Sequence, residues 1–245
     1  MGYGDELMLT GIVKKAYAKH QKPICLGQGG KNYLEDALWA EVFENNPKIA
    51  RKPYPGCVWV PDIKGNRPYL EYGKKTTYKD FRPEPGEIFF TEDEKKKYQG
   101  LGKFIYIEPN VKGSFGGNKD WGIENWEKLK IDATFIQGSG RKVLSYARQI
   151  ETKTFRDACA LLSKASLFVG TDGGLHHAAA ALNIPAIVLW GGVVSPKILG
   201  YDNHTNLHSG THSCGSWEPC EHCRKAMNWI TPKMVEDEIR KWLDL

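Results

Sequence analysis

The chain has 245 residues, of which 41% are hydrophobic and 26% are charged, and its formal net charge is +5. This is an ordinary soluble composition, long enough for one large domain or two small ones. No apolar run approaches the roughly 20 residues that span a bilayer, and acidic Asp5 and Glu6 stand where a signal peptide would be basic. We therefore expect a cytoplasmic protein without a transmembrane segment. The mild positive charge suits a polyanionic partner such as a nucleotide diphosphate, an anionic lipid or nucleic acid, but requires none of them.

The first 99 residues predict a small domain of helices and short strands. Apolar residues at helical spacing between positions 7 and 19 indicate a helix that ends in a basic turn. The segment 67–85 is rich in Pro, Gly, Lys and Tyr, which predicts mostly loop. The expected elements are helices at 7–19, 34–43 and 92–98, and strands at 23–27, 57–60 and 87–90.

From residue 100 onward, short apolar strands alternate with helices. Such continuous apolar strands do not suit a one-sided sheet, so the pattern predicts an α/β fold with a parallel sheet and helices on both faces. We place a domain boundary near Gly100-Leu101-Gly102, between an N-terminal domain 1–99 and a C-terminal domain 100–245. The expected elements are strands at 104–107, 133–136, 166–169 and 186–190, and helices at 124–129, 155–164, 175–182 and 232–243.

The last predicted helix has one apolar face, made by Met234, Val235, Ile239 and Trp242. An apolar face of this kind must be buried against another element. Because the N-terminal domain is small, we expect this helix to pack across the junction between the two domains.

The strongest local pattern is a glycine-rich turn between a strand and an Ala-rich helix, Gly170-Thr171-Asp172-Gly173-Gly174. Glycines let the backbone approach a ligand closely, and the first turn of a helix offers free N–H groups to a diphosphate. In a parallel sheet this turn lies at the carboxyl ends of the strands, where ligands bind. Asp172 could accept hydrogen bonds from sugar hydroxyls or orient the loop, and His177 could donate to a phosphate. The alternative is a tight turn in which Asp172 caps the helix and His177 is a core residue.

Four segments together resemble glycosyltransferase family 9, the heptosyltransferase-type family. The segment 172–180, followed by Ile184-Pro185, is similar to the family's Asp-small-Gly-x-x-His signature and its Pro-led strand. Lys119-Asp120-Trp121 resembles its Lys-x-Trp element, Ile230-Thr231-Pro232 the start of its C-terminal helix, and Gly2-Tyr3-Gly4-Asp5 its N-terminal loop. The resemblance covers most of residues 104–245 and the first twenty residues.

The resemblance implies a GT-B-like fold, with two Rossmann-like domains whose parallel sheets face a cleft. The N-terminal domain would be the acceptor side and the C-terminal domain would bind the nucleotide sugar. It also implies an inverting sugar transfer, without an obligatory metal, from a nucleotide-diphosphate donor to a saccharide acceptor, including a lipid-linked one. By position, the implied catalytic base is Asp5, and the implied donor-binding residues are Lys119, which would neutralise diphosphate charge, with Asp172, Gly173, Gly174 and His177. Alternatively, Asp5 caps the first helix and Lys119 is solvated.

The chain departs from the family pattern at two places. The family usually opens with a hydrophobic strand before its N-terminal loop, whereas this chain begins at the loop. Either the strand is lost, which leads us to expect a reduced N-terminal domain, or the true start lies upstream. The family tends to carry a Glu near the nucleotide ribose after the second strand of the C-terminal domain. Here Gln137-Gly138-Ser139-Gly140-Arg141 contains no Glu, so the nucleotide need not be ADP.

Cysteines and histidines gather between residues 208 and 223. The Cys220-x-x-Cys223 spacing is typical of a zinc knuckle, Cys214 could supply a third thiolate, and a histidine a fourth ligand. The predicted metal ligands are thus Cys214, Cys220 and Cys223, for a structural zinc. Unpaired buried thiols and a disulfide are the alternatives. The histidines in question are His208, His212 and His222.

Basic and aromatic residues alternate between Lys64 and Arg82. Such a loop can stack on sugars or on single-stranded or flipped bases, or it can simply bury its aromatic side chains. If functional, it is the acceptor side, with Arg67 and Tyr69 as candidates. Three functions therefore compete: transfer to a saccharide, transfer to a modified DNA base, and a non-catalytic nucleotide-sugar-binding module. Nucleic acid is the less favoured partner.

Overall fold

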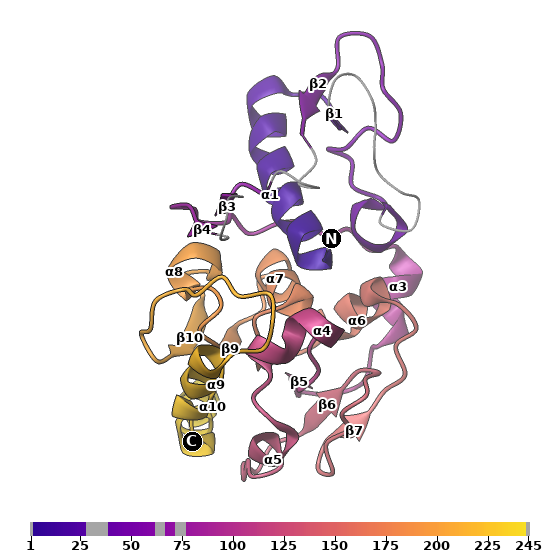
Figure 1. The fold of residues 1–245 in the computed structure, drawn as a ribbon. Helices are drawn as coiled ribbons and strands as arrows, with labels where there is room; N and C mark the ends of the chain where they lie inside the picture. Colours follow the sequence, from indigo (N-terminus) through magenta and orange to yellow (C-terminus); the bar gives the residue numbers. More distant parts are fainter. Residues whose placement is uncertain (1, 28–38, 62–66, 72–76, 244–245) are drawn as a thin grey trace.

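The computed structural model describes residues 2–27, 39–61, 67–71 and 77–243, with the side chains of residues 114 and 115 left out. Figure 1 shows a parallel sheet with helices on both faces, and a smaller part above it that contains the N-terminal helix. The chain has the α/β, GT-B-like fold that the sequence predicts. None of the helices in the described ranges is long and apolar enough to cross a membrane.

The N-terminal part is built around helix α1 (Tyr3–His20). Beside it, β1 (Ile24–Leu26) pairs in parallel with β2 (Val58–Val60). The sheet described here thus has two strands, which agrees with the expected reduction of this domain. The remaining elements are the π-helix η1 (Trp39–Phe43), the antiparallel pair β3 (Leu70–Glu71) and β4 (Thr77–Tyr78), and α3 (Glu92–Lys97).

The C-terminal part contains a six-stranded sheet in the order β10-β9-β8-β5-β6-β7, and all its pairings are parallel. From β5 the chain adds β6 and β7 on one side, then returns to add β8, β9 and β10 on the other. The strand order therefore reverses between β5 and β8, the position where open α/β sheets bind ligands. The strands are β5 (Ile105–Glu108), β6 (Phe135–Gln137), β7 (Arg148–Gln149), β8 (Leu167–Thr171), β9 (Ala186–Trp190) and β10 (His204–His208).

Two apolar cores cover the two faces of this sheet. The first joins α1 to α6 (Phe155–Leu162) and α7 (Gly174–Ala181) through residues such as Leu7 and Phe168. This core is continuous across the expected boundary at residue 100. The second lies under α5 (Ile123–Trp126), α9 (Glu221–Trp229) and α10 (Pro232–Leu243). The short elements are α4 (Gly113–Gly116), η2 (Gly117–Lys119) and α8 (Pro196–Leu199).

The prediction that α10 bridges the two domains is wrong. Its buried residues Val235 and Ile239 lie in the second core, among residues of the C-terminal sheet such as Ile107. Glu236 accepts a hydrogen bond from the backbone N–H of Lys130, which also ties α10 to this part of the chain. Trp242, which we expected on the buried face, is 42% exposed. The helix needs no second domain because the sheet face beside α5 already buries its apolar stripe.

The predicted strand at 87–90 is also wrong. This segment runs beside α1 and α6 without joining a sheet. Its polar backbone groups bind side chains instead: the N–H of Glu87 donates to Thr10, and the carbonyl of Phe89 accepts from Arg156. Hydrogen bonds to side chains thus replace the backbone hydrogen bonds that a strand would make with its neighbour.

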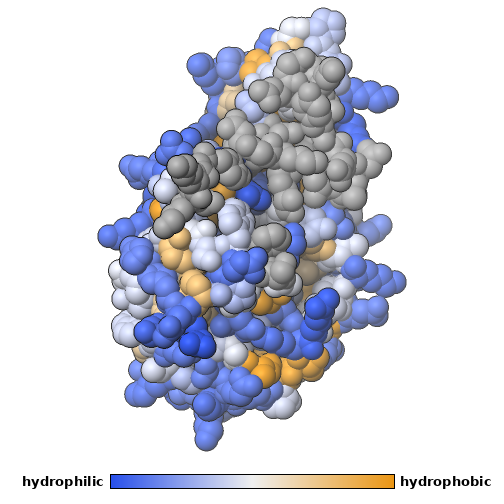
Figure 2. Space-filling view, in the orientation of Figure 1, coloured by the Kyte–Doolittle hydropathy of each residue, from blue (hydrophilic) through white to orange (hydrophobic). Residues whose placement is uncertain are grey.

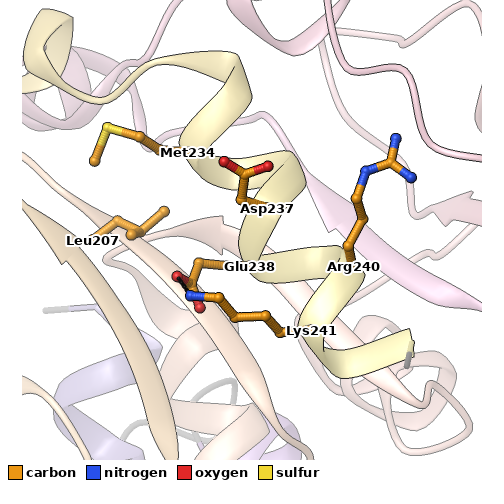
Figure 3. Close-up of a pocket in the computed structure, with 6 residues that line it drawn as sticks. All are labelled: Leu207, Met234, Asp237, Glu238, Arg240 and Lys241. Carbon is orange, nitrogen blue, oxygen red and sulfur yellow. Dashed lines mark hydrogen bonds and ion pairs between the residues drawn. The ribbon is translucent and has the colours of Figure 1, made fainter. Parts of the chain in front are cut away.

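The outer surface on the side shown in Figure 2 is mostly hydrophilic, with small scattered apolar patches. A groove of about 520 Å³ lies between β10 and α10 (Figure 3). It contains none of the predicted site residues, and its Glu238 and Lys241 are paired with each other. Its lining residues are Leu207, Met234, Asp237, Glu238, Arg240 and Lys241.

Candidate functional site

The glycine-rich turn links the end of β8 to the start of α7, next to the reversal point of the sheet. Gly173 is the residue before the helix, and a Cβ atom there would have Thr171 O, at 3.8 Å, as its nearest described neighbour. At Gly174, a Cβ atom would lie 3.0 Å from the Phe155 ring and 3.6 Å from Tyr3 Cβ. The turn is therefore open at Gly173, where a ligand could approach the backbone, and packed at Gly174.

Asp172 is a buried carboxylate with two partners. Lys119 Nζ forms an ion pair with it, and His176 Nδ1 lies 3.3 Å from its Oδ1. Burial alone would raise the pKa of Asp172, but the Lys119 charge and the hydrogen bond from His176 outweigh it and hold that pKa well below its ordinary value. Asp172 is thus ionised. Its ion pair holds Lys119, which was predicted to bind the donor, beside the predicted donor loop.

His177 lies beneath the loop in an aromatic cluster. Its Nδ1 is 2.8 Å from the Tyr201 hydroxyl, and burial, with a further contribution from His176, lowers its pKa well below the ordinary value. A neutral His177 can offer a hydrogen bond to a phosphate but no positive charge. Ligand atoms of Asp172, His176 and His177 lie within 4.8 Å of one another, so distance alone would allow a cation there. Lys119 already supplies the positive charge at this place.

Asp5, the predicted base, is held by the two residues predicted on the acceptor side. Arg67 pairs with its Oδ2 at 3.0 Å, and the Tyr69 hydroxyl donates to its Oδ1. The backbone N–H of Gly2 also donates to Oδ2, at 3.3 Å, which supports the helix-capping alternative as well. The structure therefore brings the predicted base together with the two residues predicted on the acceptor side. Other members of that basic loop, such as Lys64 and Lys75, lie outside the described residues.

The base and the donor loop belong to parts of the chain that touch. A Cβ atom on Gly4 would lie 2.5 Å from His177 Cδ2. Tyr3 stacks on Phe155, with ring centroids 4.3 Å apart. The first turn of α1, which contains Asp5, thus packs directly on the first turn of α7. This contact is the feature that unites the N-terminal and C-terminal motifs in one site.

The three clustered cysteines form a compact group beside η2 and α9. Cys214 Sγ lies 3.9 Å from Cys220 Sγ and 3.3 Å from Cys223 Sγ, so the three are free thiols at metal-binding range and not a disulfide. Burial would raise the pKa of Cys220, but hydrogen bonds from the Cys223 backbone and from both neighbouring thiols lower it. This favours a thiolate, the form that binds metals, at Cys220, whereas burial and the two neighbouring thiols raise the pKa of Cys223. His222 instead faces Thr211 and the His212 carbonyl.

Two residues of this region were not predicted from the sequence. Tyr201 follows α8 and closes the cluster around His177. Glu108 ends the apolar strand β5 beside Gly170, and burial raises its pKa to about 7. A lone acid at the end of a buried parallel strand is a recognisable signal, because ligands bind at that edge.

The sequence profile of Glycosyltransferase family 9 (heptosyltransferase) matches residues 150–230, which include the donor loop and the three cysteines. No curated protein matches the chain. Among solved structures, a family 9 glycosyl transferase from Veillonella parvula DSM 2008 is similar, with a TM-score of 0.65 and 12% identity over 99% of this chain and 94% of that one. The iron-containing dodecameric glycosyltransferase TibC from enterotoxigenic E. coli has a TM-score of 0.63 and 13% identity over 100% and 74%.

E. coli ADP-heptose LPS heptosyltransferase II is 21% identical over 64% of this chain and 53% of that chain, with a TM-score of 0.49. The chain spans about half the length of this protein and of a second one that it matches, E. coli heptosyltransferase WaaC. The match of residues 150–230 in sequence, and of the α/β fold over the full chain, confirms the resemblance to glycosyltransferase family 9 (heptosyltransferase), as a divergent relative.

Proposed function

We propose that this chain is an inverting glycosyltransferase, which moves a hexosyl, heptosyl or pentosyl group from a nucleotide-diphosphate donor to a saccharide, including a lipid-linked one. The observation that supports the proposal is the packing of Gly4 on His177, because it brings the turn of α1 that contains Asp5 onto the turn of α7, and the loop before α7 carries the Lys119–Asp172 pair. A base on one side and a diphosphate-binding loop on the other are what an inverting transfer needs. We expect it to act in the cytoplasm.

In this proposal Asp5 removes the proton from the acceptor hydroxyl as the hydroxyl attacks the anomeric carbon. Both Asp5 oxygens already accept hydrogen bonds, so the acceptor hydroxyl would take the place of the Tyr69 hydroxyl at Oδ1. Arg67 remains on Oδ2 and keeps the carboxylate oriented. The acceptor hydroxyl would therefore replace only the hydrogen bond from the neutral Tyr69 hydroxyl, and the Asp5–Arg67 ion pair would stay intact.

The departing diphosphate gains negative charge, and positive groups at the turn would stabilise it. The amides at the start of α7 and the ammonium group of Lys119 converge there. Lys119 would shift part of its interaction from Asp172 to the diphosphate when the donor binds. Asp172 would then accept hydrogen bonds from sugar hydroxyls.

We further propose that Cys214, Cys220 and Cys223 hold a structural metal. Three converging thiols suit zinc or iron, and TibC, which shares the fold, is described as iron-containing. Asn118 accepts from the Cys220 N–H at 2.9 Å and so ties the cluster to η2, which ends at Lys119. A metal here would stiffen the segment that presents Lys119. Its role would be structural, because Asp5 would supply the base and Lys119 the positive charge that binds the donor.

A thermal-shift panel of ADP, GDP, UDP and CDP tests the donor class. A ligand that binds only the folded state raises the melting temperature by mass action. We expect at least one diphosphate to stabilise the protein, and its monophosphate to do so less. If all four leave the melting temperature unchanged at millimolar concentration, a nucleotide-diphosphate donor is excluded.

A further inference from the structure

A pocket of about 380 Å³ lies in the N-terminal part of the chain, where it is built by the π-helix η1 and the turn that follows it. The backbone N–H of Glu44 donates to the Trp39 carbonyl, five residues earlier, at 3.0 Å and closes this wide helical turn. Single π-turns are rare and occur frequently at functional sites. The volume is in the range of pockets that take small molecules. The described residues that line the pocket include none of the proposed transfer site, which consists of Asp5, Lys119 and Asp172.

The inner wall of the pocket is aromatic. Trp39 and Phe43 line it and are both buried, with ring centroids 5.9 Å apart. The Arg51 guanidinium carbon lies 4.4 Å from the centroid of the Trp39 ring, and this cation–π contact holds the arginine at the pocket wall. Pro47 adds an apolar surface. Apolar surface of this kind can pack against the C–H groups of a sugar ring while polar neighbours bind its hydroxyls.

The polar side chains of the pocket are Glu44, Asn46 and Arg51. Asn46 is buried, and its Oδ1 accepts from the Lys48 backbone N–H at 2.9 Å, but its Nδ2 has no hydrogen-bond partner in the part of the chain that the structure describes. A buried donor without a partner is costly and often marks the place of a water molecule or a ligand. Glu44 is exposed and has no described Lys, Arg or His within 4.0 Å. The pocket thus offers an amide donor and a carboxylate acceptor to a ligand.

We propose that this pocket binds one unit of a saccharide, apart from the transfer site. One sugar hydroxyl would accept a hydrogen bond from Asn46 Nδ2, a second would donate to the Glu44 carboxylate, and the C–H face of the ring would lie against the aromatic wall. One carboxylate and one guanidinium give the pocket no net charge, which favours a neutral, hydroxyl-rich ligand over a phosphate or a nucleotide. Such a site would hold a saccharide chain away from the reacting sugar. The inference goes beyond the proposed function and does not depend on it.

Saturation-transfer NMR with lactose, maltotriose and chitotriose at millimolar concentration tests the assignment. We expect at least one of them to bind the wild type, and Glu44→Gln to weaken this binding about tenfold, as for the loss of one hydrogen bond to a charged group. Glu44 is exposed, so this variant should fold normally. Glu124→Gln, which is also exposed and lies outside the pocket, is the matched control and should bind as the wild type does.

Asn46→Ala should weaken the binding as well. Because Asn46 also accepts from the Lys48 N–H, a melting curve is needed to identify any loss that comes from unfolding. If none of the three saccharides binds, or if a bound one is indifferent to either substitution in a folded variant, the assignment of this pocket is wrong. The proposed transfer reaction stands or falls separately, on the thermal-shift panel of nucleotide diphosphates.

Discussion

A Cβ atom on Gly4 would lie 2.5 Å from Cδ2 of His177, so the first turn of α1 meets the first turn of α7 at a point where only glycine fits. Gly4→Ala should therefore lower the melting temperature and the affinity for a nucleotide diphosphate, although Ala favours a helix by about 1 kcal/mol over Gly. At Gly2 a Cβ atom would meet no described atom within 4 Å. Gly2→Ala is thus the control, and equal behaviour of the two variants in thermal and binding assays would show that this contact is unimportant.

Asp5→Asn should reduce turnover by about 10²-fold or more, because the amide cannot accept the proton. The affinity for nucleotide diphosphate should stay within about twofold, since Asp5 acts on the other substrate. Turnover can be followed as diphosphate release from the donor in the presence of the acceptor. Tyr69→Phe removes one hydrogen bond to Asp5 and should cost less than tenfold. Wild-type turnover in Asp5→Asn would leave Asp5 only its role at the helix terminus.

The sequence predicted the strands and helices that carry a strong apolar pattern. β9 and α10 begin and end where expected, because their apolar runs are bounded by clear helix or turn signals. β10 was missed since His204, Thr205, Asn206 and His208 give it no apolar run, and its strand structure comes from pairing with β9. The orientation of α10 was mispredicted because an apolar face shows that a helix is covered, but not by which element.

Site residues could be predicted from the sequence where they belong to a motif, and not where only the fold brings them into the site. Asp172 and Lys119 are 53 residues apart in sequence, yet each was assigned to the donor from its own motif, and the structure pairs them. Arg67 and Tyr69 were proposed from composition alone, and their contact with Asp5 could not be derived without the fold. Glu108 belongs to no motif, and its position at the reversal point of the sheet comes from the strand order, which the sequence alone does not give.

Purified protein should contain about one metal ion per chain, bound by the three cysteines. Cys220→Ala should lower that content strongly, because it removes one of three converging ligands. Cys57→Ala, outside the cluster, should leave it unchanged. Elemental analysis by mass spectrometry gives the amount and distinguishes zinc from iron. Wild-type protein without metal, or Cys220→Ala with full content, would show that the thiols are simply unpaired.

The raised pKa of Glu108 makes its effect on stability depend on pH. The folded-state pKa, about 7, is above the ordinary value of 4.5, so ionisation penalises the folded state. The penalty is absent below pH 4.5, grows between 4.5 and 7, and is complete above 7. Glu108→Gln should therefore be more stable than the wild type at pH 8, by about 3 kcal/mol, and nearly equal at pH 4.5. Urea unfolding at both pH values measures the difference, and a pH-independent difference would contradict the account.

The donor site at the turn before α7 is the central claim, and calorimetric titration of a nucleotide diphosphate into matched variants tests it most directly. Gly173→Val places a branched side chain where the diphosphate should approach the backbone, at a position with room for a Cβ atom in the folded protein. Gly174→Val is a poorer choice because Phe155 lies 3.0 Å from its Cβ position. We predict that the wild type binds at least one diphosphate, and that Gly173→Val keeps its melting temperature but loses at least about tenfold in affinity. Equal affinity of the two proteins for every diphosphate that binds would contradict a donor site at this turn.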